Sequence, residues 1–199
     1  MSTTFEDQLA VLKSLEIFNA LNEYDTARCK EIKEFTEAQS SIEGEIAQCG
    51  VYFGLTAWFM AKNFNGKVNL FDSFQGLPAL SEKDSNFYEE GMWYVPHSEA
   101  EKTFKGINNV KFYIGWLPGT LELVSDTKFS MVHLDLDLYQ PTLDCLNFFW
   151  ERMSPGGLII CDHHKGVATG VLTAVEEFFG NADFPSSECG QMLIYKPVD

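Results

Sequence analysis

The side chains best suited to chemistry gather at two points in the second half of the chain. In the run His133-Leu-Asp-Leu-Asp-Leu-Tyr139, polar residues alternate with leucines. A period of two places His133, Asp135 and Asp137 on one face of an extended segment. Carboxylates among apolar residues are costly unless they are paired, hydrogen-bonded or bound to a metal. The spacing therefore predicts a functional site where this segment ends.

A second polar group, Cys161-Asp-His-His-Lys165, follows another apolar run. If the two runs are neighbouring strands, Asp135, Asp162 and His163 converge on one divalent cation. Carboxylate oxygens suit Mg²⁺, whereas an imidazole shifts the preference toward Mn, Fe or Zn. The alternative for His163 and His164 is a solvated pair of loop histidines.

A glycine-rich turn and a later acid form a third pattern. Gly50-Val-Tyr-Phe-Gly54 follows an apolar run and opens a helical pattern, and Asp72 ends the next apolar run. Glycine lets a ligand approach the backbone, and a helix N-terminus supplies N–H donors. A carboxylate in the place of Asp72 can accept hydrogen bonds from ribose hydroxyls. The alternatives are a turn without a ligand and a helix-capping Asp. Together the two motifs favour a ribose-containing cofactor.

The elements that must position these residues alternate between strands and helices. Apolar runs predict strands at residues 45–51, 67–71, 110–114, 129–136, 158–161 and 191–196. Helical patterns start near Leu55, Pro141 and Val171, and Pro155-Gly-Gly157 is expected to stop the chain before the fifth strand. This alternation predicts a doubly wound, mostly parallel α/β sheet, whose ligands bind at the carboxyl ends of the strands.

One domain is expected over residues 1–199, with residues 41–199 as its Rossmann-like core. Residues 1–40 predict an N-terminal helical cap, in which apolar residues recur every three or four positions (Phe5, Leu9, Leu12, Leu15 and Phe18). We interpret this stripe as a packing face; the alternative is a cover over a substrate pocket. Residues 73–109 lack strand patterns, and a segment of that length predicts a lid.

Composition narrows the range of partners. The formal charge of −15 repels phosphate backbones, so neither nucleic acid nor an anionic membrane surface is an expected partner. No apolar run approaches the roughly 18–20 residues of a spanning helix, and the first residues are acidic where a signal peptide is basic. The five cysteines are widely spaced without a CxxC pair, which predicts reduced thiols and a cytoplasmic location.

Residues 43–179 resemble the metal-dependent macrocin O-methyltransferase family. These class I enzymes transfer the methyl group of S-adenosylmethionine (SAM) to hydroxyls of sugars and other small natural products. The resemblance lies in five segments that agree in order and spacing: Gly44-Glu-Ile-Ala-Gln-Cys-Gly-Val-Tyr-Phe-Gly54, Phe71-Asp-Ser-Phe-Gln-Gly-Leu-Pro78, His133-Leu-Asp-Leu-Asp-Leu-Tyr-Gln-Pro-Thr-Leu143, Ser154-Pro-Gly-Gly157 and Ala174-Val-Glu-Glu-Phe178.

The resemblance implies a SAM site around the glycine turn, with Asp72 on the ribose and Gly115-Trp116 near the adenine. The complete set of implied cofactor residues is Gln48, Gly50, Val51, Tyr52, Gly54, Asp72, Ser73, Gly115, Trp116 and Asp135. It also implies that Asp135, Asp162 and the next residue bind a divalent metal. Three positions depart from the family pattern, because Gln48 replaces an acid, His163 replaces the second acidic ligand and His164 replaces an aromatic residue.

The expected reaction is methyl transfer to a hydroxylated small molecule, with Asp135, His163 or His164 taking the proton. Because of the departures, another metal, a metal-free histidine base and a degenerate site all stay open. One alternative function is a SAM-binding protein without catalysis. Another is an NAD(P)-dependent oxidoreductase, which the absent third glycine disfavours. The acceptor and the oligomeric state, including a homo-oligomer, stay open.

Overall fold

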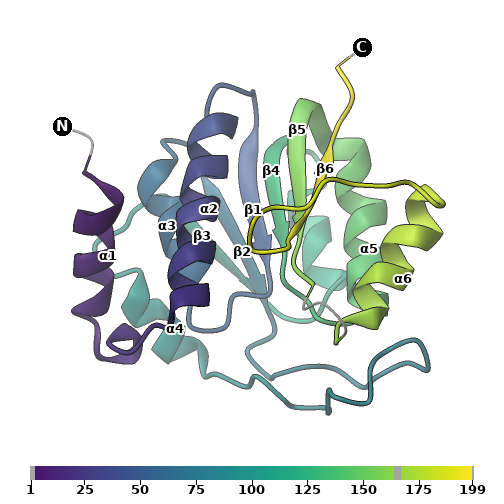
Figure 1. Ribbon diagram of the computed structural model, residues 1–199, viewed down its shortest axis with the longest axis horizontal. Coiled ribbons are helices and arrows are strands. Elements are labelled where there is room, and N and C mark those ends of the chain that lie inside the picture. Colours follow the sequence, from purple (N-terminus) through teal and green to yellow (C-terminus); the bar gives the residue numbers. More distant parts are fainter. Residues whose placement is uncertain (1–2, 164–166, 199) are drawn as a thin grey trace.

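The computed structural model describes residues 3–163 and 167–198, and a six-stranded sheet runs through its centre (Figure 1). The strand order is β3-β2-β1-β4-β5-β6. Only β6 is antiparallel to its neighbour, so the predicted mostly parallel α/β sheet is confirmed. The strands are β1 (Glu45–Cys49), β2 (Val68–Asp72), β3 (Val110–Ile114), β4 (Phe129–Leu134), β5 (Met153–Cys161) and β6 (Met192–Tyr195).

Strand order explains where a ligand can enter. β1 pairs with β2 on one side and with β4 on the other, so the connections leave β1 in opposite directions. At such a switch point the carboxyl ends of the central strands border a crevice. These ends point toward the lower edge of the molecule in Figure 1, where the segment after β2 passes beneath them.

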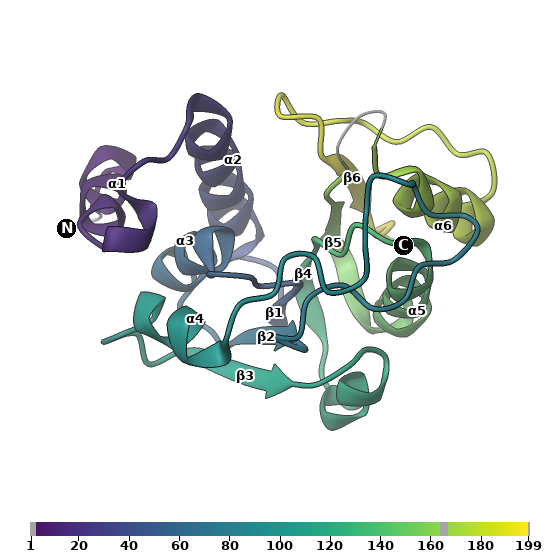
Figure 2. The ribbon, with the colours of Figure 1, turned by 90° about the horizontal axis from the view of Figure 1, so that it is seen from below.

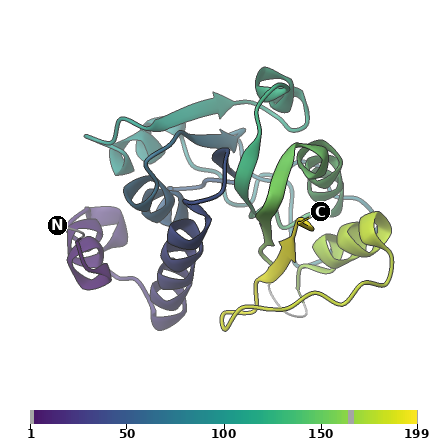
Figure 3. The same cartoon turned by 90° about the horizontal axis from the view of Figure 1, so that it is seen from above.

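Helices cover both faces of the sheet (Figures 2 and 3). On one face, the buried residues of α1, α2 and α3 share an apolar cluster with Ile46, Leu70 and Met131. On the other, α5 and α6 pack on the alternate strand residues, such as Ala47 and Val132. The helices are α1 (Phe5–Lys13), α2 (Glu23–Gln39), α3 (Leu55–Asn63), α4 (His97–Thr103), α5 (Tyr139–Phe149) and α6 (Thr169–Phe179), with 3₁₀ turns η1 (Glu16–Phe18), η2 (Gly119–Val124) and η3 (Trp150–Arg152).

The N-terminal stripe belongs to two elements rather than one helix. α1 ends at Lys13, and the chain bends into η1 before α2 begins. Phe5 packs on Phe59 of α3 with ring centroids 5.4 Å apart, as a packing face requires. Phe18, in contrast, also borders the cavity described below. Phe5 and Phe18 thus both belong to the apolar cluster, and a cover over a substrate pocket stays a prediction.

One other local expectation differs from the structure. Pro155-Gly-Gly157 does not precede the fifth strand but lies inside β5, which already begins at Met153. A shift in the pairing of β4 with β5 between Phe129 and Met131 accommodates this irregular stretch. The Gly156 amide also donates to Lys196 O at 2.9 Å, so pairing with the C-terminal chain keeps this stretch in the strand although Gly156 has a left-handed φ of +78°. Among the described residues, no helix is long and apolar enough to cross a membrane.

Candidate functional site

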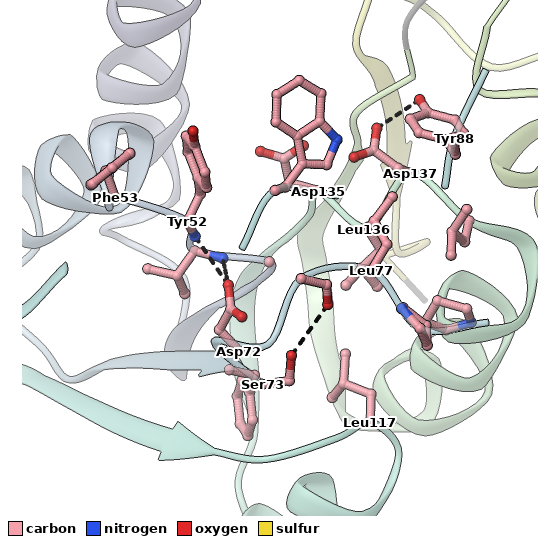
Figure 4. Close-up of a pocket in the computed structure, with 18 of the residues that line it drawn as sticks. Tyr52, Phe53, Asp72, Ser73, Leu77, Tyr88, Leu117, Asp135, Leu136 and Asp137 are labelled. Atoms are coloured by element: carbon pink, nitrogen blue, oxygen red, sulfur yellow. Dashed lines mark hydrogen bonds between the residues drawn. The ribbon is translucent and has the colours of Figure 1, made fainter. Parts of the chain in front are cut away.

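A cavity of about 1000 Å³ opens at the carboxyl ends of β1, β2 and β4. Most of its wall comes from the strand ends, the segment after β2, the stretch from η1 to the start of α2, and the start of α5. Figure 4 shows Asp72, Asp135 and Asp137 on the strand-end side, with Leu77 and Tyr88 of the segment after β2 beside them. The cavity therefore lies where strand order predicts a ligand site.

The turn after β1 depends on Gly50. Its φ of +82° is left-handed, and a Cβ atom here would lie 1.9 Å from the backbone oxygen of Asp135. Only glycine allows this approach between the ends of β1 and β4. Gln48 is buried behind the turn, where its amide donates to Gly50 O at 2.8 Å and to Thr56 Oγ1 at 2.9 Å. Gln48 thus supports the turn from behind, whereas the cavity wall is formed by Gly50, Val51 and Tyr52.

Asp72 closes β2 and holds the same turn. The amides of Val51 and Tyr52 donate to its Oδ2 at 2.7 and 3.0 Å (Figure 4), and the Phe74 amide donates to its Oδ1 at 2.7 Å. A carboxylate offers roughly four acceptor positions, so about one remains here. The free position lies on Oδ1, which suits one ribose hydroxyl. A second hydroxyl contact requires the turn to shift.

The other expected cofactor residues fall into two groups. Ser73, Gly115 and Trp116 line the cavity beside Asp72. Gly54 instead precedes α3 as its N-cap, with a left-handed φ of +87°. Its contribution is therefore to start the helix behind the turn.

Asp135 and Asp162 lie close together, and a cation from the protein lies between them. Nη2 of Arg28, on α2, contacts Asp135 Oδ2 and lies 2.6 Å from Asp162 Oδ2. Ligand atoms of His133, Asp135 and Asp162 all lie within 4.8 Å of one another. Within residues 3–163 and 167–198, His133 and not His163 completes this group, and His164 lies outside the described residues.

Burial determines the charge states around the acid pair, which is Asp135 and Asp162. Burial lowers the pKa of His133, Asp135 opposes this effect and Arg28 adds to it, and the resulting pKa of about 4 leaves the imidazole neutral at pH 7. Burial lowers the pKa of Arg28, but Asp135 and Asp162 together raise it above its ordinary value. Burial and Asp162 raise the pKa of Tyr24 to about 12, so its hydroxyl stays protonated.

The residues present do not fit the divalent metal that the resemblance implies. Two carboxylates and a neutral imidazole are suitable ligands in type. However, Mg²⁺ must lie about 2.0–2.1 Å from its oxygen ligands. A guanidinium nitrogen already contacts one oxygen of each carboxylate. A metal between Asp135 and Asp162 would collide with Arg28.

Arg28 and Tyr88 are two residues of the site that the sequence patterns missed. Asp137 has a left-handed φ of +61°, so the strand alternation ends before it. Its Oδ1 accepts a hydrogen bond from Tyr88 Oη at 2.8 Å (Figure 4). Burial and Asp137 raise the pKa of Tyr88 well above its usual range. Tyr88 belongs to an irregular segment and Arg28 to a polar helix, and neither carries a local motif.

Comparison with known proteins identifies the family of this chain. The family model for the macrocin O-methyltransferases (TylF) matches residues 24–186. A tetracenomycin-series rhamnosyl 4'-O-methyltransferase of Streptomyces olivaceus is 27% identical over 146 residues, which are 65% of this chain and 56% of that protein. Demethyldecarbamoylnovobiocin O-methyltransferase of Streptomyces niveus is 25% identical over 161 residues, 72% of this chain and 61% of the relative. The matches thus span less than two thirds of these relatives.

Solved structures share the fold. The O-methyltransferase NovP superposes with a TM-score of 0.73 at 20% identity, covering 86% of this chain and 80% of NovP. The calicheamicin methyltransferase CalS11 gives 0.74 at 16% identity, covering 98% of this chain and 94% of CalS11. At these identities the likeness concerns the fold alone, and the family match carries the assignment. The chain belongs to the macrocin O-methyltransferase family.

Proposed function

We propose that this chain is a SAM-dependent O-methyltransferase whose acceptor is a hydroxyl of a small molecule. The observation that carries the proposal is the cavity at the switch point, where the Gly50 turn, Asp72 and Asp135 meet. The matched relatives support the reaction type, since each is named for O-methyl transfer to a natural product. The rhamnosyl group in one of these names also favours a sugar-bearing acceptor.

The cavity has room for a cofactor and an acceptor together. Its volume of about 1000 Å³ is at the upper end of the range for small-molecule pockets, roughly 300–1000 Å³. We assign the methionine part of SAM to the Gly50 turn, one ribose hydroxyl to Asp72 and the adenine to the side of Trp116. Apolar residues from the other walls, such as Phe18, Leu77 and Trp93, leave the acceptor a largely apolar compartment.

The chain's own task is to position the acceptor and to take its proton. SAM supplies an activated methyl group: the acceptor oxygen forms a bond to the methyl carbon while the carbon–sulfur bond breaks and its electrons stay on sulfur. The hydroxyl proton must leave during this step. Asp135 is our candidate acceptor for it, because its side chain lines the cavity and is 29% exposed, whereas Asp162 is only 5% exposed. His163 and His164 stay as predictions.

The cellular location and the class of acceptor are also part of the proposal. The described cysteines are free, and most are buried, which suits a reducing compartment. We therefore propose a cytoplasmic location. A net charge of −15 disfavours nucleic acid as an acceptor.

Calorimetry and radiolabelled methyl transfer test the proposal. We expect S-adenosylhomocysteine to bind the purified chain, and tritiated methyl from SAM to appear on members of a panel of glycosylated and phenolic acceptors. The variant D135N should lose about 10²–10⁴-fold in turnover while its affinity for S-adenosylhomocysteine changes less than about threefold. The matched control D126N alters an exposed Asp remote from the cavity and should behave like wild type.

Three other outcomes would contradict parts of this proposal. Binding without transfer to any acceptor indicates a SAM-binding protein without catalysis. Binding of NAD(P)H in place of SAM indicates an oxidoreductase. Unchanged turnover in D135N excludes Asp135 as the proton acceptor.

A further inference from the structure

We infer that the guanidinium of Arg28 takes the place of a divalent cation in this chain, so that the protein itself neutralises one of the two negative charges of Asp135 and Asp162. This inference deepens the proposed function, and only its activity measurement rests on that function.

The fold forces two negative charges together. Asp135 follows the end of β4 and Asp162 the end of β5, and these parallel neighbours pair up to Leu134 and Cys161. The Asp162 amide donates to Leu134 O at 2.8 Å, so the backbone leaves little freedom to separate the acids. Like charges in a poorly solvated place need a counter-ion. Arg28 supplies it, with only 13% of its side chain exposed.

The packing of helix α2 fixes the position of Arg28. Cys29 and Ile32 on the same helix are fully buried in the apolar cluster beneath it, which fixes the rotation of the helix about its axis. At its N-terminus, Asn22 Oδ1 accepts a hydrogen bond from the Asp25 amide at 2.8 Å and sets where the helix begins. The guanidinium therefore belongs to the framework of the site, and a planar, permanently charged group suits two carboxylate oxygens.

The substitution of one cation for another changes the charge left on the acid pair. A divalent cation would neutralise both carboxylates, whereas one guanidinium leaves a single negative charge. The more exposed acid is Asp135, which lines the cavity. The residual charge therefore stays available to accept a proton beside the acceptor.

Binding of Mn²⁺, followed by electron paramagnetic resonance of the metal-stripped full chain, tests the inference without any activity. Wild type should leave Mn²⁺ free at concentrations where R28Q binds about one equivalent, at least tenfold tighter, because removal of the guanidinium opens the site. The additional change D162N in R28Q should abolish that binding. The matched control is K30Q, which removes the same charge from an exposed position of α2, where Lys30 is 61% exposed and pairs only loosely with Glu34 at 4.0 Å.

Two results overturn the inference. One is a wild-type chain that binds one Mn²⁺ and loses it in D135N or D162N. The other is a folded R28Q, judged by circular dichroism, that binds Mn²⁺ no better than wild type. If R28Q does not fold, R28K keeps a cation in the site and the wild-type titration with its D162N control still decides the question.

Methyl transfer supplies the second readout. Wild-type turnover in excess EDTA should stay within about twofold of turnover in Mg²⁺, and R28Q should lose at least tenfold in EDTA and regain part of it in Mn²⁺. A wild-type rate that requires added metal contradicts the inference. Failure of the proposed function looks different, since no condition then yields methyl transfer while the Mn²⁺ titration still reports on Arg28.

Discussion

At the scale of single residues, the site pairs charged groups with a buried neutral one. His133 is fully buried beneath Asp135, and its Nε2 lies 3.2 Å from Gln191 Nε2, which also reaches Asp162 Oδ2 at 3.4 Å. The neutral imidazole leaves the charge balance to Arg28 and the two acids. A second positive charge at His133 would have no solvent to stabilise it.

Acid should therefore destabilise the protein partly through His133. Its pKa is about 4 in the folded state and near 6.5 when unfolded, so the unfolded chain binds the proton first as pH falls. The free energy of unfolding should fall from about pH 6.5 downward, with His133 accounting for up to roughly 3 kcal/mol below pH 4. Urea unfolding of wild type and H133Q between pH 7 and pH 4 measures this, and H133Q should show the shallower dependence. Parallel curves would contradict the assignment.

At the scale of elements, the turns at the strand ends carry unusual backbone conformations. Non-glycine residues with left-handed φ are Tyr52, Phe74, Trp93 and Asp137, and all but Phe74 line the cavity. Such conformations cost free energy and persist only where the surroundings enforce them. At Tyr52, Trp93 and Asp137, these conformations direct the residue toward the cavity, whereas a regular strand or helix would direct it elsewhere.

The Gly50 turn can be tested against a glycine of the same conformation. Gly50 and Gly91 have φ of +82° and +81°, but a Cβ at Gly91 has no atom within 4 Å, whereas one at Gly50 meets the Asp135 backbone. We expect G91A to cost about 1–2 kcal/mol of unfolding free energy from φ strain alone. G50A should cost roughly 3 kcal/mol or more, because the β1–β4 contact must also open. Equal losses in chemical denaturation would show that the close approach contributes nothing.

At the scale of the whole molecule, the segment from Ser73 to α4 crosses from the β2 side of the sheet to the helices on the β4 side and returns. It leaves β2, passes beneath the strand ends toward α6 and returns to α4 (Figure 2). Asp84 anchors its far end: Oδ1 accepts the Tyr139 amide at the start of α5 at 2.6 Å, and Oδ2 accepts the Ser81 amide at 2.7 Å. This segment therefore depends on distant helices for its place over the cavity.

Removal of the Asp84 carboxylate should release this segment. In D84A, the hydrogen bond to Tyr139 is lost, at a cost of roughly 1–3 kcal/mol, and residues 73–96 should exchange amide hydrogens faster. Hydrogen–deuterium exchange with mass spectrometry localises the change. The control K83Q removes the neighbouring exposed ion pair with Glu177, which should matter by less than about 1 kcal/mol. Unchanged exchange in D84A would show that Asp84 does not hold the segment.

The sequence by itself determined the order of the elements, the sheet type and the edge at which the site lies. Hydrophobic period and turn residues are local properties, and parallel strands bring their carboxyl ends to one edge. The Gly50 turn, Asp72 and Asp135 were therefore located from their positions along the chain. The expected third strand agrees with β3 in both bounds.

Only the tertiary structure decided what stands between the acids and how the strand ends bend. Arg28 is 107 residues from Asp135, and no local pattern encodes a contact over that distance. The turn at Asp137 and the position of Pro155-Gly-Gly157 inside β5 run against local preference, because hydrogen bonds to Tyr88 and to the C-terminal chain outweigh it. Side chains that meet through packing of separate elements are determined by the whole fold, and Arg28 between Asp135 and Asp162 is the example on which the chemistry depends.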